Sequence, residues 1–501
     1  MKSPGALTVV LLLLLTLVSC ASDPTPTPSS DPIASPTLAS TPSPGPDPTA
    51  TPKPTPIRTS SLTPPDLQAD VIFFNGTIIT MEPDLSSAKA VAVLGTKILH
   101  VGNDQETLAF AGPDTHLVDL AGRTLLPGFV DPHTHPLDYD SADSLDETQQ
   151  YMLAGGTTTI GDTAAAPDKL VRVLLALEST DLRIRTSLYL SYNSKCNGIQ
   201  PEDWILEHPP ILDPTAMFRI PGIKIFGDPA GPSTRCGWAP MSVLLPPEFA
   251  EERAAGPYGD ILLSEEEMAQ VIAKHQALGY QVVIHARGDI TVDIALNAIQ
   301  AALAGQPNTF RHRIEHNDYV RPDQLPRYGE VGALPTIRGR PAACGFNNSG
   351  GVHPFGEEVQ PWFRVGMSLL DANPGLPVAW HSDVGSFGRR PIHDLYDLVT
   401  RKAISRADGS VCEPPDWLAA KVVSVEDALR MMTINPAYAL FMDEMVGSLK
   451  AGKFADLVIL SDNPLTVDPD SLIDLEVLMT MVGGHVEHCA QEALCPVSKD
   501  N

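Results

Sequence analysis

The middle of the chain, residues 128–445, alternates short apolar runs with amphipathic stretches. The apolar runs include QVVIHARGD and PVAWHSD, and the amphipathic stretches include SEEEMAQVIAKHQALG, in which apolar residues recur every three or four positions. The first pattern is typical of buried strands and the second of helices. Repeated strand-then-helix units build a parallel sheet, which commonly closes as a (β/α)8 barrel. We therefore predict an α/β protein with a TIM barrel over residues 128–445.

Both ends of the folded region are rich in strand-forming residues. ADVIFFNGTIITM and AVAVLGTKILHVG stand near its start, and GKFADLVILSDNP and LEVLMTMVGGHVEH stand near its end. Turn signals such as Asn-Gly separate the apolar runs, as in short antiparallel strands. We expect residues 66–127 and 446–501 to combine into one small β-sandwich domain, with a tail after the last strand.

The first 20 residues have the pattern of an export signal. Lys2 precedes an apolar run over residues 6–18, which is too short to span a bilayer comfortably but suits the apolar region of a signal peptide. The run ends in LVSC (17–20), which resembles the lipobox of bacterial lipoproteins. That resemblance implies cleavage before Cys20 and lipidation of this cysteine. An ordinary secretory signal cleaved nearby is the alternative.

Residues 21–65 consist almost entirely of Pro, Thr, Ser, Ala and Asp, as in TPSPGPDPTATPKPTP. They contain no apolar periodicity from which a core could be built, and their proline content favours extended polyproline II structure. We expect a disordered linker that holds the folded part away from a membrane anchor. The expected location is outside the cytoplasm, on a lipid anchor, with free secretion as the alternative.

The charge of the chain restricts its partners. The formal net charge is −27, and residues 1–65 contain three basic and three acidic residues, so the whole excess belongs to residues 66–501. An acidic domain repels phosphate backbones and anionic lipid. We therefore expect a small-molecule substrate, no nucleic acid, and membrane contact only through the N-terminal lipid. Oligomeric state is left open.

Polar residues that could perform chemistry follow the apolar runs. The C-terminal ends of barrel strands surround one cavity, so residues distant in sequence meet there. Alternation along a strand also puts His133 and His135 on the same side, with Thr134 between them pointing away. The residues at the expected strand ends are His133, His135, Lys224, His285, His316 and Asp383.

The order of these residues resembles that of the amidohydrolase superfamily of metal-dependent hydrolases. The resemblance runs from about residue 69 to residue 488 and rests on the motifs TLLPGFVDPHTH, GIKIFGD, VVIHARGD, RHRIEHND, HSD, TINPAYAL and GSLKAGKFADLVIL. KIFGD, HARGD and RHRIEH are most similar to the YtcJ-like branch, also called amidohydrolase 3. The resemblance implies the TIM barrel with its added β-domain and a divalent metal, expected to be Zn²⁺, at one or two sites per chain.

The resemblance also implies a role for each matching residue. His133, His135 and Asp383 would hold the more buried metal, and His285 and His316 the second. Lys224 would bridge both metals if its amine were carboxylated, because a carbamate is anionic whereas a lysine ammonium is a poor ligand. An uncarboxylated Lys224 that binds substrate or pairs with Asp228 is the alternative, and it would leave a mononuclear site. Glu315 is expected to orient a neighbouring residue.

The expected reaction is hydrolysis of a carbon–nitrogen bond in a non-peptide amide, an N-acyl compound or a cyclic amide. A metal-bound water loses its proton near neutral pH and attacks the carbonyl carbon, and Asp383 moves the proton to the leaving nitrogen. One alternative is a mononuclear aminohydrolase acting on a heterocycle, but HARGD lacks the glutamate that such enzymes usually carry there. The other is an inactive tethered binding protein, although no histidine or aspartate ligand is missing.

The loops expected over the barrel mouth do not resemble those of the branch. The stretches 193–210 and 336–363 therefore give little information about the substrate, and Arg338, Arg340 and Trp362 are candidate contacts. None of the cysteines forms a CxxC pair. Cys489 and Cys495 are the pair most easily closed into a disulfide, since only five residues separate them.

Overall fold

The computed structural model describes residues 67–83, 88–137, 142–178, 180–194, 198–200, 202–229, 239–243, 259–339, 343–344, 353, 355–383, 390–405 and 408–496. The expected signal peptide with Cys20, the expected linker and Arg340 lie outside these residues. Residues 62–501 belong to one compact unit. Within the described part, no helix combines the length and apolarity that crossing a bilayer requires.

The centre of this unit is a sheet of eight strands that follow one another in chain order, each parallel to the next. Nearly all of their residues are buried, which explains why the runs read as continuous apolar segments rather than as alternating ones. The strands are β7 (Phe129–Thr134), β8 (Thr157–Ala165), β9 (Arg185–Ser191), β10 (Phe218–Phe226), β11 (Gln281–Ala286), β12 (Arg313–His316), β13 (Leu334–Arg338) and β14 (Ala379–His381). The predicted (β/α)8 barrel is confirmed.

The first and last strands meet at a seam. The backbone N–H of Asp383 donates to the carbonyl oxygen of His133 at 3.1 Å. The backbone N–H of Ser382 donates to Oδ1 of Asp131 at 3.2 Å, and the Ser382 hydroxyl donates to the other oxygen of that carboxylate. These bonds take the place of a regular ladder between β14 and β7, and they bring the ends of the two strands together.

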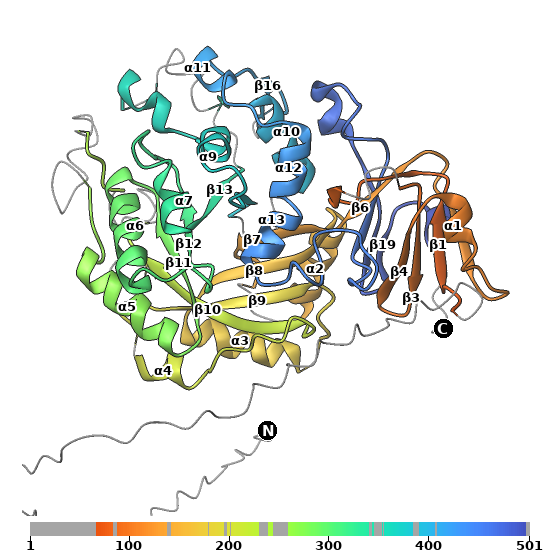
Figure 1. Ribbon diagram of the computed structural model, residues 1–501, viewed down its shortest axis with the longest axis horizontal. Coiled ribbons are helices and arrows are strands. Elements are labelled where there is room, and N and C mark those ends of the chain that lie inside the picture. The colour runs from red at the N-terminus through yellow and green to blue at the C-terminus, as the bar shows by residue number, and fades with distance from the viewer. Residues whose placement is uncertain are drawn as a thin grey trace, which may run out of the picture. The chain divides into compact units, whose positions relative to one another are not determined.

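Helices follow most of the strands and pack outside the barrel (Figure 1). In α5 the sequence SEEE forms a capping box, in which the Ser264 hydroxyl accepts from the Glu267 backbone N–H and the Glu267 carboxylate accepts from the Ser264 backbone N–H. The helices are α2 (Ala142–Leu153), α3 (Pro167–Leu177), α4 (Glu202–Leu206), α5 (Glu265–Ala277), α6 (Asp289–Leu303), α7 (Arg327–Val331), α9 (Gly366–Ala372), α10 (Pro391–Thr400), α11 (Asp416–Ala419), α12 (Val425–Met431) and α13 (Ile434–Ala439). The described residues also form the 3-10 helices η5 (Glu357–Trp362), η6 (Pro469–Asp474) and η7 (Glu492–Leu494).

Two further sheets form the β-domain. One contains β4 (Lys97–Gly102), β3 (Ala90–Leu94), β1 (Val71–Phe74) and β5 (His116–Asp119), with α1 (Asp104–Leu108) beside it. The other contains β19 (His485–Cys489), β18 (Val477–Val482), β17 (Leu457–Leu460), β6 (Thr124–Pro127) and β2 (Thr77–Ile78). Antiparallel pairing of β17 with β6 joins strands from the two ends of the chain, as predicted. Phe73, Val91, Ile459 and Met479 share the core between the sheets.

Two disulfides occur among the described cysteines. Cys489 and Cys495 are bonded, as expected from their spacing. Cys344 and Cys412 form a second disulfide across 68 residues, which the sequence did not indicate. Cys412 lies in the short hairpin β15 (Ala403–Ile404) and β16 (Val411–Cys412), so this bond ties the hairpin to the segment after β13.

A buried ion pair links the barrel to the β-domain. Arg185, at the start of β9, donates from Nε and Nη2 to the Asp456 carboxylate at 2.8 and 3.1 Å, and both side chains are at most 3% exposed. The Gly483 N–H donates to the same carboxylate, and the guanidinium lies 3.8 Å from the centroid of the Phe454 ring. Because removing one member of a buried pair leaves a charge without its partner, this contact should strongly influence stability.

We predict that Asp456→Asn destabilises the protein by about 3–5 kcal/mol, the usual result of breaking a buried ion pair. Urea denaturation followed by circular dichroism measures this loss. Asp168→Asn is the matched control, because it breaks the Arg172–Asp168 pair on the surface of α3, where Asp168 is 75% exposed, and exposed pairs contribute about 0–1 kcal/mol. Equal effects of the two substitutions would contradict the account.

Candidate metal centre

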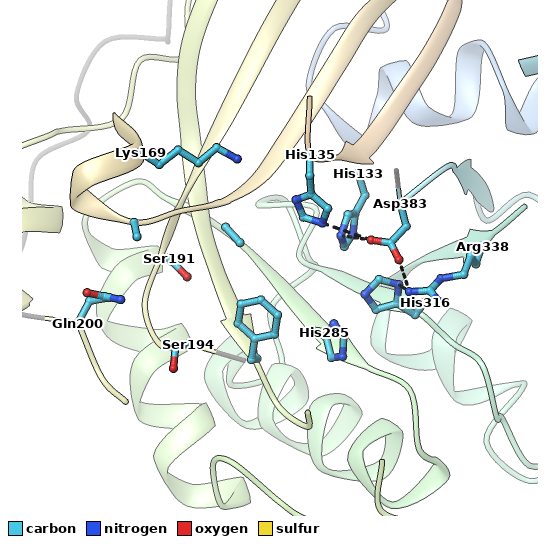
Figure 2. A pocket seen from close by; sticks show the side chains of 13 residues that line it. His133, His135, Lys169, Ser191, Ser194, Gln200, His285, His316, Arg338 and Asp383 are labelled. Carbon is cyan, nitrogen blue, oxygen red and sulfur yellow. Dashed lines mark hydrogen bonds and ion pairs between the residues drawn. The ribbon is translucent and has the colours of Figure 1, made fainter. Parts of the chain in front are cut away.

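The predicted site residues converge at the C-terminal ends of the barrel strands. His133 is the next-to-last residue of β7, and His135 follows that strand directly. His285 is the next-to-last residue of β11, and His316 ends β12. Together with Asp383, which follows β14, these residues line one cavity of about 490 Å³ (Figure 2). A cavity of this size suits a small-molecule ligand.

The first group consists of His133, His135 and Asp383. Oδ1 of Asp383 lies 3.2 Å from Nε2 of His135 and 3.6 Å from Nε2 of His133 (Figure 2). The two imidazole rings are perpendicular, with centroids 5.2 Å apart. Two ring nitrogens and a carboxylate oxygen therefore face a common point, and their ligand atoms lie within 4.8 Å of one another.

The other nitrogen of each ring is already held. Nδ1 of His133 lies 2.5 Å from Oε2 of Glu315, and Nδ1 of His135 lies 2.9 Å from the carbonyl oxygen of Thr163. A histidine that donates from one nitrogen to a carboxylate or carbonyl presents the lone pair of the other nitrogen to a metal. Burial, with the ammonium of Lys224, holds the pKa of His133 well below its usual value, so the ring is neutral.

Glu315 has the orienting role that we expected. It is fully buried, and its carboxylate accepts from Nε of Arg313 and from the Thr336 hydroxyl, each at 2.9 Å. Burial alone would raise the pKa of Glu315, but Arg313 and His133 hold it well below its usual range. The carboxylate is therefore ionised and keeps the ring of His133 in one orientation.

A second group of histidines packs behind the first. The centroids of the His285 and His316 rings are 4.3 Å apart, and those of His133 and His381 are 4.7 Å apart in a stacked arrangement. The ligand atoms of His133, His316 and His381 also lie within 4.8 Å of one another. Nε2 of His316 and both ring nitrogens of His381 are buried without a hydrogen-bond partner among the described residues. The sequence did not single out His381 as a ligand.

Lys224 is fully buried, and its Nζ has no hydrogen-bond partner in the described part of the chain. Burial lowers the pKa of this amine to about 8. The alternative pairing with Asp228 is not what the structure shows. Oδ2 of Asp228 accepts from the backbone N–H groups of Arg287 and Gly288, each at 2.9 Å, and its Oδ1 lies 3.1 Å from Nε2 of His285.

Two of these side chains depend on unusual backbone conformations. His316 has a φ of 75° and Asp383 has a φ of 51°, the left-handed region that residues other than glycine seldom adopt. Such conformations are found at functional sites, where the surrounding structure stabilises them. The simple alternation of side chains along a strand could not have predicted either one.

Arg338, at the end of β13, contacts the carboxylate of Asp383 from the other side. Its Nη2 donates to Oδ2 of Asp383 and lies 3.5 Å from Nδ1 of His316 (Figure 2). Burial would raise the pKa of Asp383, but Arg338 and then His135 hold it well below its usual range. Asp383 is therefore ionised. Of the other two candidate contacts, Trp362 packs in an apolar cluster around Tyr319 and Phe363, outside the set of cavity-lining residues.

The donor set fits a divalent metal. In the first group, two imidazoles whose second nitrogens are held by acceptors lie beside an ionised carboxylate, which is an arrangement that zinc ligands require. In the second group, ring nitrogens of His316 and His381 are buried without partners among the described residues. Without a bound cation, the described residues would leave several of these buried polar atoms unsatisfied.

Comparison with known proteins identifies the family. The amidohydrolase family model matches residues 139–488, more than half of the chain, so this protein belongs to that family. The match begins after His133 and His135, which makes the geometry of these two residues an independent observation.

Two relatives and one solved structure illustrate the similarity. The chain is 22% identical to an N-substituted formamide deformylase of Arthrobacter pascens over 83% of this chain and 97% of that protein. It is 26% identical to an imidazolonepropionase of Symbiobacterium thermophilum over 74% of this chain and 83% of that protein. An uncharacterized metal-dependent hydrolase of Pyrococcus horikoshii has the same fold, with a TM-score of 0.62 and 18% identity over 80% of this chain and 99% of that one.

We predict that Glu315→Gln lowers the affinity for zinc about 10- to 100-fold, the usual effect of removing the partner of a metal-binding histidine. The amide would no longer hold His133 as a carboxylate does. Competition with a chromophoric chelator measures the affinity, and Glu330→Gln, which alters an exposed glutamate on α7, is the control. An unchanged affinity in Glu315→Gln would show that His133 is not a ligand.

Proposed function

We propose that this protein is a metal-dependent hydrolase that cleaves the carbon–nitrogen bond of a small amide, an N-acyl compound or a cyclic amide. The observation that carries this proposal is the position of Asp383, whose ionised carboxylate lies between His133 and His135 on one side and Arg338 on the other, at the wall of the cavity. A base at this position can reach both an attacking water and a leaving group.

His133, His135 and Asp383 are the residues that would hold the first metal, for which the nitrogen and oxygen donors suit zinc. His285 and His316 would hold a second, and Lys224, as a carbamate, would bridge the two. The support for the carbamate is that Nζ of Lys224 is buried and has no hydrogen-bond partner among the described residues. When bound, such an ion acidifies a water molecule and polarises the substrate carbonyl.

The residues of the chain supply the remaining chemistry. Oδ2 of Asp383 is held by Arg338, which leaves Oδ1 directed toward the histidines. In this position the carboxylate accepts the proton of the water that attacks the carbonyl carbon and then delivers it to the leaving nitrogen. The cavity wall formed by Phe226, Ala164 and Ala166 gives the apolar part of a substrate a surface to pack against.

The named relatives support the class of reaction. An N-substituted formamide deformylase and an imidazolonepropionase both act on carbon–nitrogen bonds, and each matches most of this chain. The residues that follow His285 do not favour the heterocycle aminohydrolase, because Arg287 and Asp289 bond to Asp318 and Ser242. We further propose, from the sequence of residues 1–65, a lipid anchor on Cys20 and a location outside the cytoplasm.

We predict that Asp383→Asn lowers turnover about 100- to 10,000-fold, the contribution of a general acid–base group, while most of the metal stays bound through the histidines. The measurements are hydrolysis of a panel of N-acyl amino acids, cyclic amides and esters, together with elemental analysis of the variant. Asp443→Asn, which removes the partner of Arg311 outside the cavity, is the control. Activity that survives in Asp383→Asn would show that Asp383 is not the base.

A further inference from the structure

The cavity wall carries two cationic side chains, Lys169 and Arg338, among the described residues that line it. They come from different sides of the barrel: Lys169 from α3, after β8, and Arg338 from the end of β13. Figure 2 shows them on opposite sides of His135, with Arg338 beside Asp383 and His316. Because the chain has a net charge of −27, two cations at one cavity raise the question of whether either binds an anionic ligand.

The charge of Lys169 is balanced by a carboxylate of its own. Its Nζ lies 2.7 Å from Oδ1 of Asp162, which is fully buried. The other oxygen of Asp162 accepts from the Leu137 N–H at 2.8 Å. This pair resembles an ordinary buried ion pair that fixes the end of β8 and the start of α3.

Arg338 is placed differently. The carboxylate that it contacts, Asp383, also lies 3.2 and 3.6 Å from two histidine nitrogens, where a metal would compete for it. The next carboxylate, Asp318, accepts a hydrogen bond from Arg287 through Oδ2 at 2.6 Å, and Nη1 of Arg364 lies 3.7 Å from its Oδ1. Nε of Arg338 is buried and has no hydrogen-bond partner among the described residues.

Among the described residues, the guanidinium therefore has more hydrogen-bonding capacity than its neighbours satisfy, although Nη2 is bonded to Asp383. A guanidinium binds a carboxylate through two parallel hydrogen bonds, and such charge-assisted bonds are about twice as strong as neutral ones. Burying the group without a full set of partners is unfavourable, and an anionic group on a bound ligand would supply the missing acceptors. The cavity is the direction from which such a ligand arrives.

We propose that Arg338 binds the carboxylate of the substrate, and that the substrates are N-acyl α-amino acids. This inference rests on the proposed function, since it names the substrate class of the same site. The spacing favours an α-carboxylate: Nη2 of Arg338 bonds Asp383 and lies 3.5 Å from Nδ1 of His316, so a group bound there is only a few bonds from the reacting carbon.

The reaction balances as a hydrolysis. Water adds its oxygen to the acyl carbon, the carbon–nitrogen bond breaks, and the nitrogen takes up the proton carried by Asp383. The products are a carboxylic acid and a free amino acid, whose α-carboxylate stays on Arg338 until release. The acyl chain extends away from Arg338, toward Phe226 and the hydroxyl groups of Ser191 and Ser194 on the other wall.

The test compares two matched substrates on the zinc-loaded protein: N-acetyl-leucine, in both enantiomers, and N-acetyl-leucinamide, which lacks only the negative charge. We expect the preferred enantiomer of the acid to be hydrolysed with a kcat/KM about 100-fold or more above that of the amide, because a site built for an ionic hydrogen bond discriminates strongly against an analogue that lacks it. An N-acyl amino acid with a distant carboxylate, 4-acetamidobutanoate, should behave like the amide.

Arg338→Met should lower kcat/KM for the acid at least about 10-fold more than kcat/KM for the amide. Both substrates lose the support that Arg338 gives to Asp383, and only the acid also loses the partner of its carboxylate, which should appear mostly in KM. Arg338→Lys should recover part of the loss, since it keeps the charge but not the paired hydrogen bonds. Arg311→Met is the matched control: it removes a similarly buried arginine from its partner Asp443, outside the cavity, and should leave the preference unchanged.

Equal losses on the acid and the amide would show that Arg338 acts only by positioning Asp383, and this result would overturn the inference. A wild-type protein that hydrolyses amides but prefers neutral ones would overturn it too, while leaving the proposed function intact. If neither substrate is hydrolysed, the proposed function fails for this class of substrate. Calorimetric titration with N-acetyl-leucine then tests the carboxylate subsite by itself. Weaker binding to Arg338→Met than to the wild type supports the subsite, and equal binding or no binding overturns it.

Discussion

The seam between the first and last barrel strands is the constraint on which the site depends. There the backbone N–H of Asp383 bonds to the carbonyl oxygen of His133, and Asp131 accepts from both donors of Ser382. The same few residues therefore close the barrel and bring a carboxylate from one end of the barrel sequence to the imidazoles of the other end. A change that opened this seam would separate Asp383 from His133 and His135 even if all three residues remained.

Charge is the second constraint. His133 is buried where a positive charge is unfavourable, which holds its pKa well below the usual value, and the carboxylates of Glu315 and Asp383 are kept ionised by arginines behind them. Arg313 supports Glu315, and Arg338 supports Asp383. This arrangement holds the lone pairs of the ring nitrogens toward the cavity before any ligand arrives, which is the kind of preorganisation that metal sites need.

Much of this could be predicted from the sequence, because strand ends in a parallel barrel meet at one face. This property of barrels was sufficient to select His133, His135, His285, His316 and Asp383 as neighbours. The strand-forming residues at both ends of the folded region were sufficient to predict the β-domain. Other features depend on three-dimensional packing that no local pattern reports. The left-handed backbone at His316 and Asp383, the stacking of His381 on His133 and the Cys344–Cys412 disulfide belong to this class. The contact of Arg338 with Asp383, and the lack of a partner for its Nε among the described residues, depend on how the neighbouring side chains pack. The sequence could therefore name Arg338 only as a candidate contact.

The most direct test of the account is the position of bound metal in crystals of the zinc-loaded protein, measured by anomalous scattering at the zinc absorption edge. The account predicts a peak between Nε2 of His133, Nε2 of His135 and the Asp383 carboxylate. If the second site is filled, a second peak should lie near His285 and His316, with additional density on Nζ of Lys224. Zinc bound elsewhere on the molecule, with no peak beside His133 and His135, would contradict the account.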